Sequence, residues 1–201
     1  MEKIYNRNIM LYCLRLNRFL GLRPQEVRAL SKEDVHFLDL EYYDEMLQRK
    51  ITVQGIKVHV AHSVGSTLTD ELALTNLKTA GSERNVFGGA EARKIVEEIL
   101  AYCKTDILFA DYNGNLISST RMADYVRRVK RAWQKETGST TDIYSVLMRK
   151  SLSADNCRNS VNQAITRDLM GHASVETSLN WYTSTSEQEQ IDAMLNRKFK
   201  K

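Results

Sequence analysis

Residues 4–30, IYNRNIMLYCLRLNRFLGLRPQEVRAL, hold the strongest indications of the fold. Their first part places apolar residues at the spacing of one buried helix face, at Ile4, Ile9, Met10, Cys13, Leu14, Leu16, Phe19 and Leu20. Gly21 stands where a glycine ends a helix, and Pro24, the only proline, stands where a proline begins one. We therefore predict a core helix over 4–20 and a second helix over 24–30, with Arg23 immediately before its N-terminus.

Beyond residue 30 the spacing of apolar residues changes. Residues 39–45 are acidic and aromatic, and they predict a short helix or a structured insertion. Apolar and polar residues then alternate, which indicates a small antiparallel sheet, at Ile51, Val53, Ile56, Val58, Val60, Leu72 and Leu74. The turn pair Ala80-Gly81 within KTAGSERNV predicts a hairpin flanked by Lys78 and Arg84.

The remainder of the chain predicts helices over 90–103, 118–135, 143–157, 161–170, 175–182 and 186–196, followed by a basic tail. The second of these carries one acid, Asp124, against six cations, which are Arg121, Arg127, Arg128, Lys130, Arg131 and Lys135. A charge run can be only a solvated helix face, but this excess also suits contact with a phosphate backbone. One proline and nine glycines in 201 residues favour long helices over a sandwich or propeller.

Composition limits the class of protein further. The chain has a net charge of +4 and 42% hydrophobic residues, which fits one globular domain. It contains neither a long apolar run nor a secretory leader, so we expect a cytoplasmic protein without a membrane partner. Cys13, Cys103 and Cys157 lack the spacing of a zinc site or a disulfide framework, and we expect them to be small buried apolar residues. Glycine-rich phosphate loops, metal-binding motifs and paired carboxylates are absent from the sequence.

Four short polar segments follow one another along the chain: GLRPQEVRAL at 21–30, LKTAGSERNV at 77–86, VLMRKS at 146–151 and MGHASVETSLNWYTS at 170–184. Glu26 follows Arg23 by three residues, and Tyr182 follows His172 by ten. Arg149 precedes that histidine by 23 residues. In this order and at this spacing, the segments resemble the catalytic domain of the tyrosine recombinase, or phage integrase, family, from about residue 8 to about residue 195.

The resemblance implies an α+β fold that is mostly helical, with a small three-stranded antiparallel sheet. It implies a site-specific recombinase or integrase that cleaves and rejoins DNA through a 3′-phosphotyrosine intermediate, without a metal or cofactor. The implied roles are phosphate binding by Arg23, Arg149 and His172, protonation of the leaving 5′ oxygen by Lys78, nucleophilic attack by Tyr182, and support of the first arginine by Glu26. Arginine suits the phosphate role because its planar fork can donate two hydrogen bonds to one phosphate.

Double-stranded DNA is then the expected partner, bound by a tetramer of chains that are monomers when isolated. Its expected contacts are Arg84, Arg121, Arg127, Arg128, Lys130 and Arg131. Residues 1–201 would form a single catalytic domain, with 185–201 as a C-terminal helix and basic tail. The N-terminal DNA-clamping domain that is typical of the family would be absent from this chain.

The sequence departs from the family pattern in two respects. Val146 and Lys150 stand where the family usually has histidines around Arg149, and Trp181 stands beside Tyr182. Two other functions therefore remain open at this point, a type IB topoisomerase-like relaxing enzyme and a DNA-binding integrase fragment with impaired catalysis. Taken alone, Arg23 and Glu26 are more typical of a surface ion pair three residues apart on a helix than of a catalytic site.

Overall fold

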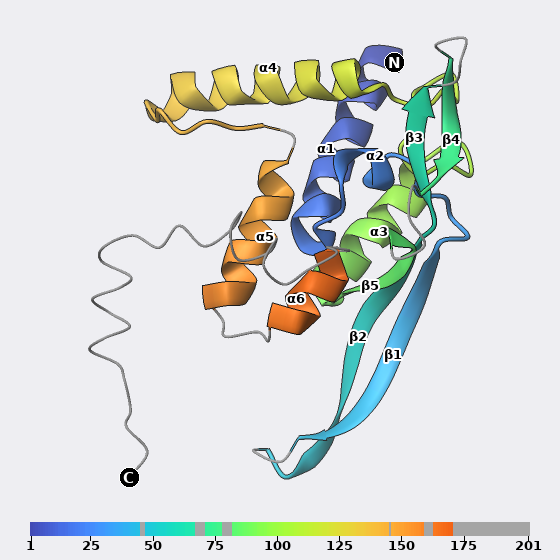
Figure 1. The fold of residues 1–201 in the computed structure, drawn as a ribbon, viewed down its shortest axis with the longest axis vertical. Helices are drawn as coiled ribbons and strands as arrows, with labels where there is room; N and C mark the ends of the chain where they lie inside the picture. The colour runs from blue at the N-terminus through green and yellow to red at the C-terminus, as the bar shows by residue number, and fades with distance from the viewer. Residues whose placement is uncertain (45–46, 67–70, 78–81, 145, 159–162, 171–201) are drawn as a thin grey trace.

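The computed structural model describes residues 1–44, 47–66, 71–77, 82–144, 146–158 and 163–170 (Figure 1). Lys78, Trp181, His172 and Tyr182 lie outside these ranges, as do the helices predicted over 175–182 and 186–196 and the tail at 185–201. In chain order the elements are α1 (Glu2–Leu20), α2 (Pro24–Val27), β1 (Val35–Asp44), β2 (Arg49–Val60), β3 (His62–Ser66), β4 (Leu72–Asn76), β5 (Arg84–Gly88), α3 (Ala90–Tyr102), α4 (Ser119–Thr137), α5 (Leu147–Arg158) and α6 (Gln163–Met170).

Helix α1 is the central element of the core, and it confirms the helix predicted over 4–20. Ile9, Cys13 and Leu16 on its buried face are completely inaccessible to solvent. Helices α3 and α5 pack against α1, and Figure 1 shows them on either side of it. The helix ends at Gly21, whose φ of 62° lies in the left-handed region that favours glycine. The predicted ends of this helix therefore lie within two residues of the observed ends.

Strands β1, β2 and β5 form a three-stranded antiparallel sheet in that order. Strand β1 pairs with β2 over its whole length, whereas β5 pairs only with residues 56–60 at one end of β2. The rest of β1 and β2 forms a two-stranded ribbon that extends from the body in Figure 1. Residues 39–44 belong to β1, so the prediction of a short helix there was wrong, and the stretch is a strand because each of these residues has a partner on β2.

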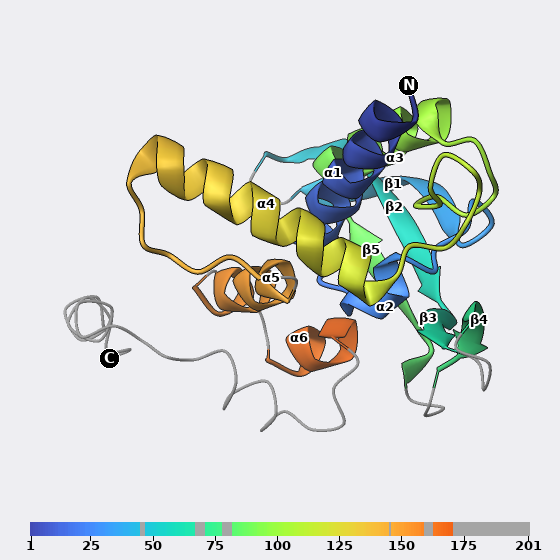
Figure 2. The ribbon, with the colours of Figure 1, turned by 90° about the horizontal axis from the view of Figure 1, so that it is seen from above.

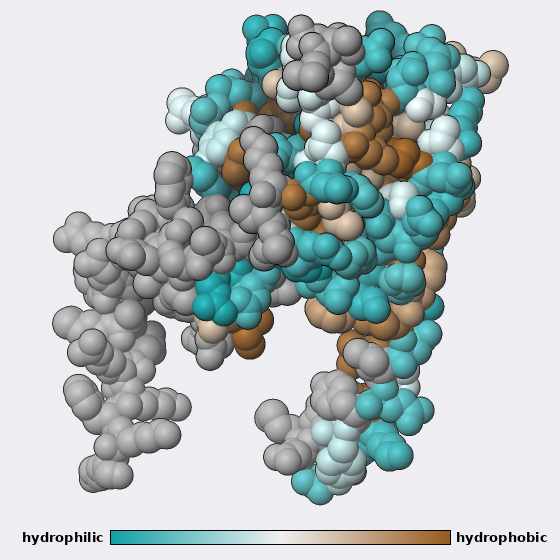
Figure 3. Space-filling view, turned by 45° about the vertical axis from the view of Figure 1, so that its right-hand side comes forward, coloured by the Kyte–Doolittle hydropathy of each residue, from teal (hydrophilic) through white to brown (hydrophobic). Residues whose placement is uncertain are grey.

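A second sheet consists of β3 and β4, which pair antiparallel from His62 opposite Asn76 to Ser66 opposite Leu72. The predicted antiparallel sheet is thus present, together with this additional hairpin. The alternation at Leu72 and Leu74 belongs to the second sheet, and both side chains are exposed. Figure 3 shows a surface that is mainly hydrophilic over the free end of the ribbon and carries apolar patches on the body above it.

Helix α2 is shorter than predicted, since it ends at Val27 instead of Leu30. Arg28, which follows it, is 3% exposed. Its Nε donates to the carbonyl of Pro24 at 2.9 Å, and its Nη1 donates to the carbonyl of Ile117. A buried guanidinium needs such acceptors, and the loop before α4 supplies one of them. The remaining predicted helices that fall within the described residues are present as α3, α4, α5 and α6.

Helix α4 lies across the N-terminal half of α1, as Figure 2 shows from above. Between the two helices is a groove of about 680 Å³, lined by α1 residues up to Met10 and by α4 residues from Arg121 to Ala132. The C-terminal end of α1, by contrast, meets α2, α5 and α6. Among the residues described, no helix is both long enough and apolar enough to cross a membrane.

Candidate active site

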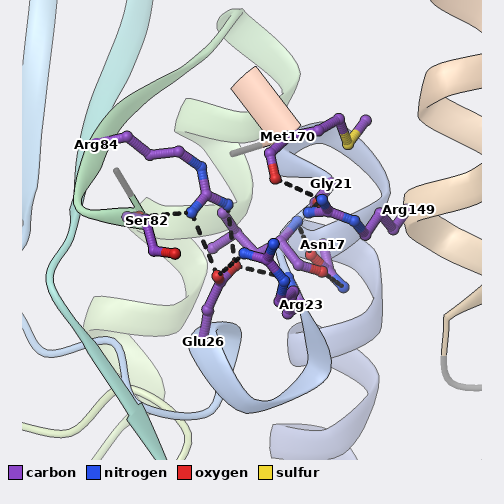
Figure 4. A network of polar contacts seen from close by, with 9 residues as sticks. Asn17, Gly21, Arg23, Glu26, Ser82, Arg84, Arg149 and Met170 are labelled. Carbon is purple, nitrogen blue, oxygen red and sulfur yellow. Dashed lines mark hydrogen bonds and ion pairs between the residues drawn. The ribbon is translucent and has the colours of Figure 1, made fainter. Parts of the chain in front are cut away.

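Glu26 is the centre of a polar network at the C-terminal end of α1 (Figure 4). It lies at the third position of α2, and its side chain is 1% exposed. Its Oε2 accepts the backbone N–H of Arg23 at 2.8 Å, and its Oε1 accepts Nη1 of the same arginine at 2.7 Å. The first bond satisfies a donor that the helix N-terminus leaves without an intrahelical partner. The pair is therefore not the exposed ion pair that the sequence also allowed.

Arg84, the first residue of β5, approaches the same carboxylate from the other side. Its Nη1 lies 3.2 Å from Oε1 of Glu26, and its Nη2 lies 2.9 Å from Oε2. Its Nη1 also donates to the carbonyl of Ser82 at 2.9 Å, and its side chain is only 7% exposed. One buried carboxylate thus joins two arginines from distant parts of the chain.

The electrostatics of Glu26 follow from these contacts. Burial alone raises the pKa of its carboxyl group, because desolvation disfavours the charged form. The hydrogen bonds and charge of Arg84, and then the hydrogen bonds from Arg23, outweigh burial and hold the pKa below its ordinary value. Glu26 is therefore a carboxylate at neutral pH, and the three side chains together carry one net positive charge.

Arg149, on the first turn of α5, holds the neighbouring backbone. It is 3% exposed, and its Nη1 donates to the carbonyl of Gly21 at 2.7 Å. Its Nη2 donates to the carbonyl of Met170, the last residue of α6 (Figure 4). A single guanidinium therefore connects the ends of α1 and α6.

The segment from Gly21 to Arg23 is fixed from several sides. Asn17, buried on α1, accepts the N–H of Leu22 at 2.7 Å through Oδ1 and donates to its carbonyl at 3.1 Å through Nδ2. A Cβ on Gly21 would lie 2.7 Å from Cδ2 of Leu152, so α5 packs directly against this turn. The side chain of Arg23, which is 33% exposed, therefore leaves a rigid backbone with its guanidinium at the surface. Such an arrangement can bind an anion without reorganising.

The structure thus brings Arg23, Glu26 and Arg149 into one site. Lys78, His172 and Tyr182 lie outside the described residues, but described residues close to two of them in sequence are part of the network. Met170, two residues before His172, contacts Arg149, and Ser82, four residues after Lys78, contacts Arg84.

The cations predicted on α4 lie elsewhere. Their helix packs on the N-terminal half of α1, while Arg23 follows its C-terminal end, and the 19 residues of α1 span about 28 Å. Arg127 pairs with Asp124 at 2.7 Å, and Arg128 donates to the carbonyl of the same aspartate at 3.4 Å. Arg131 is exposed. All of these side chains face solvent at least in part.

Two acids outside α4 offset its charge, and the sequence count did not reveal them. Asp111 pairs with Arg121 at 2.8 Å, and Asp142 pairs with Lys130. Burial raises the pKa of Asp111, but the hydrogen bond from Arg121 and two backbone N–H donors hold it below its ordinary value. Arg84, which the sequence grouped with the α4 cations as a DNA contact, instead has a nearly buried guanidinium bound to Glu26. These partners lie 10, 12 and 58 residues away from their cations, outside the reach of helical spacing, so only the folded structure identifies them.

Comparison with known proteins places the chain in a family. The model of the phage integrase family matches residues 2–189. The integrase of the Tn1549 transposon, solved in complex with circular intermediate DNA, is similar to this chain with 16% sequence identity and a TM-score of 0.70. The match covers 92% of this chain and 58% of that integrase. The XerA recombinase is 14% identical with a TM-score of 0.60. The match covers 99% of this chain and 64% of that recombinase.

A third solved structure, the XerH recombinase bound to its difH substrate, is 17% identical with a TM-score of 0.58. There 94% of this chain covers 47% of the recombinase. No curated protein matches the chain. At these identities the structures show a shared fold, and the chain spans about half to two thirds of their length.

Proposed function

We propose, from the premise that this chain belongs to the phage integrase family, that it cleaves and rejoins DNA strands in site-specific recombination. The observation that carries the proposal is the joining of Arg23 and Arg149 through the fixed turn at Gly21. Arg149 is 3% exposed and its guanidinium donates to two carbonyls, so in this proposal it exchanges an acceptor when it binds the phosphodiester that Arg23 also binds. Arg23, held by Glu26 on a fixed backbone, is the pre-organised donor that stabilises the charge developing in the transition state.

In the proposed reaction, the hydroxyl oxygen of Tyr182 attacks the phosphorus of a DNA phosphodiester. A bond forms between that oxygen and phosphorus, and the bond from phosphorus to the 5′ oxygen breaks. Tyr182 gives its proton to solvent water, and Lys78 gives a proton to the departing 5′ oxygen. The product is a 3′-phosphotyrosine, and attack by a 5′ hydroxyl group reverses the step and rejoins a strand.

Arg23, Arg149 and His172 bind the non-bridging oxygens during this step. The bonds of Met170 with Arg149 and of Ser82 with Arg84 support the assignment, because Met170 precedes His172 by two residues and Ser82 follows Lys78 by four. We further propose that the partner is duplex DNA, that four chains assemble on it, and that the reaction takes place in the cytoplasm. The exposed cations of α4 contact the DNA backbone in this proposal.

A covalent-capture experiment tests the proposed function. The chain is incubated with a pool of labelled nicked duplexes whose central positions are randomised, so that the cleaved strand diffuses away and the adduct accumulates. We expect an adduct that survives SDS for the wild type and for Tyr43→Phe, a change at an exposed tyrosine of the ribbon, and none for Tyr182→Phe. An adduct that persists in Tyr182→Phe shows that another residue is the nucleophile.

Val146 favours a second candidate function, DNA binding without cleavage. It begins the turn that leads into α5, three residues before Arg149, and its carbonyl accepts the N–H of Lys150 at 3.1 Å. A valine side chain can neither donate a hydrogen bond nor titrate. If the wild type binds the pool but forms no adduct at any salt concentration, this second function replaces the first. Relaxation of a supercoiled plasmid by the wild type, without sequence preference, indicates the topoisomerase-like activity instead.

A further inference from the structure

We infer that Arg84 is a positioning residue that holds Glu26 in place and, through it, the phosphate-binding Arg23. The inference rests on the proposed function and adds a residue whose side chain holds the others in place. Its basis is a chain of contacts from Ser82 through Arg84 and Glu26 to Arg23. The two side chains in the middle of this series of contacts, those of Arg84 and Glu26, are only 7% and 1% exposed.

Contact geometry gives Arg84 two simultaneous tasks. Its two Nη atoms form a fork on the two carboxylate oxygens of Glu26, and one of them also binds the carbonyl of Ser82. A lysine cannot reproduce this pattern, because an ammonium group is a single point without a planar fork. Arg84 is also fixed at its backbone, because it pairs with Val60 in the sheet.

Glu26 links Arg84 to Arg23, so a fixed position of Arg84 also fixes Arg23. Oε1 of Glu26 accepts hydrogen bonds from both arginines, so a shift of the carboxylate moves the donor that faces solvent. A carboxylate that is 1% exposed is stable there only while cations surround it. Removal of Arg84 takes away the larger of the two cationic contacts that stabilise this carboxylate. Arg23 is then bonded to a Glu26 side chain that has moved or become protonated.

Direct contact of Arg84 with DNA is the competing explanation. Its side chain is 7% exposed, and its guanidinium already contacts a carboxylate and a carbonyl. A cation that binds the DNA backbone should change DNA affinity and its salt dependence when it is removed. A positioning residue should change the rate of cleavage on bound DNA instead.

The test compares Arg84→Met and Arg84→Lys with a control, Arg93→Met, on a duplex captured in the adduct experiment. Arg93 is an arginine of α3 that pairs with Asp39 and Glu97 away from the site. For each variant, the rate of adduct formation at saturating DNA and the dissociation constant of the duplex are measured. We expect Arg84→Met to lower the rate about 100-fold, the size that misplacement of reacting groups can reach. The dissociation constant should stay within about threefold, because few phosphate contacts are lost.

A second substrate separates an effect on Arg23 from an effect on the leaving group. It carries sulfur in place of the bridging 5′ oxygen, and a thiolate leaves without a proton because its conjugate acid has a pKa of about 8.5. Because Arg23 binds the non-bridging oxygens, we expect the sulfur substrate to leave the ratio of the Arg84→Met rate to the wild-type rate unchanged, with Arg84→Lys between the two. If the sulfur substrate restores the rate of Arg84→Met, Arg84 acts on protonation of the leaving group and not on Arg23.

Failure of this inference is distinct from failure of the proposed function. If the wild type forms no adduct, the proposed function fails. If the wild type forms an adduct and Arg84→Met forms it at the same rate, or if the variant loses only DNA affinity, Arg84 is not a positioning residue. A variant that unfolds is replaced by the double change Glu26→Gln with Arg84→Met, which removes both buried charges. Its rate should equal that of Glu26→Gln alone, and a further loss overturns the inference.

Discussion

The arginines around Glu26 and the arginines of α4 occupy opposite ends of α1, and Arg84 and Arg127 show the contrast between them most clearly. Arg84 is 7% exposed and makes three hydrogen bonds to a carboxylate and a carbonyl. Arg127 on α4 is 58% exposed and pairs with one aspartate that is itself 45% exposed. The first group is fixed by the fold, whereas the second can exchange its partners with solvent ions.

This difference indicates two uses of the same residue type. A fixed guanidinium has lost its freedom during folding, so it can stabilise a transition state without further ordering. An exposed guanidinium is better suited to bind a DNA backbone, where counterion release supplies the free energy and position matters less. Net charge does not distinguish the two, because both groups include neutralising carboxylates.

Loss of the Glu26 carboxylate should have the largest effect on stability. Glu26→Gln leaves Arg84 nearly buried without its counterion, and we expect the free energy of unfolding to fall by about 3 kcal/mol. The matched change on α4, Asp124→Asn, should cost less than about 0.5 kcal/mol because its pair with Arg127 is exposed. Urea unfolding measures both, and equal losses contradict the contrast between the two regions.

The two left-handed glycines that end α1 and α4 give a comparison of backbone effects. Gly21→Ala should cost about 2 to 3 kcal/mol, since it adds a clash with Leu152 to the strain at a φ of 62°. Gly138→Ala, at a φ of 67° with nothing within 4 Å, should cost only about 1 to 2 kcal/mol. Thermal unfolding of both variants measures the difference. If Gly138→Ala is the more damaging change, the turn at Gly21 is less tightly packed than described.

The pH dependence of stability should also report the Glu26 network. Its folded-state pKa is lowered from 4.5, so its contribution to stability is complete above that value. The contribution is then lost as the pH falls from about 4.5 through the lower pKa of the folded state. Glu26→Gln should therefore show a shallower fall of unfolding free energy between about pH 5 and pH 3 than the wild type. Parallel curves contradict a lowered pKa at this residue.

Removal of single α4 cations should have the smallest effect. Arg127→Ala should weaken DNA binding only a few-fold and reduce the slope of log affinity against log salt by about 0.9 for one lost phosphate contact. Its free energy of unfolding should change by less than about 0.5 kcal/mol. Fluorescence anisotropy at several salt concentrations measures the slope. An unchanged slope means that α4 does not contact the phosphate backbone.

Local signals in the sequence predicted the elements that position the site. Apolar spacing and Gly21 located α1, and Pro24 located the start of α2. The strand at residues 39–44 was missed because its acidic and aromatic residues gain a strand conformation from β2, and that pairing is not visible locally. The bond from Arg28, which follows α2, to the carbonyl of Ile117 was equally invisible locally, because the two residues are distant in sequence.

The candidate site was predictable in part for the same reason. The spacing of Arg23 and Glu26 within one turn indicated their ion pair, and the structure shows that contact. Sequence reasoning missed the role of Arg84 because its partner, Glu26, precedes it by 58 residues. A cation near a turn looks the same in sequence whether it faces solvent or a buried carboxylate. Burial, which sequence alone does not supply, distinguishes the two.

The most direct test of the division between the two regions is one assay on Arg23→Lys and Arg127→Lys, changes that keep the positive charge. It measures the rate of adduct formation on the captured duplex as the DNA concentration is raised to saturation. We predict that Arg23→Lys lowers the saturated rate by about 100-fold or more, the usual cost of losing one donor to a transition state. Arg127→Lys should raise the dissociation constant for DNA, and its rate at saturating DNA should equal that of the wild type. If saturating DNA restores the rate of Arg23→Lys to that of the wild type, Arg23 serves binding alone and the central claim is wrong.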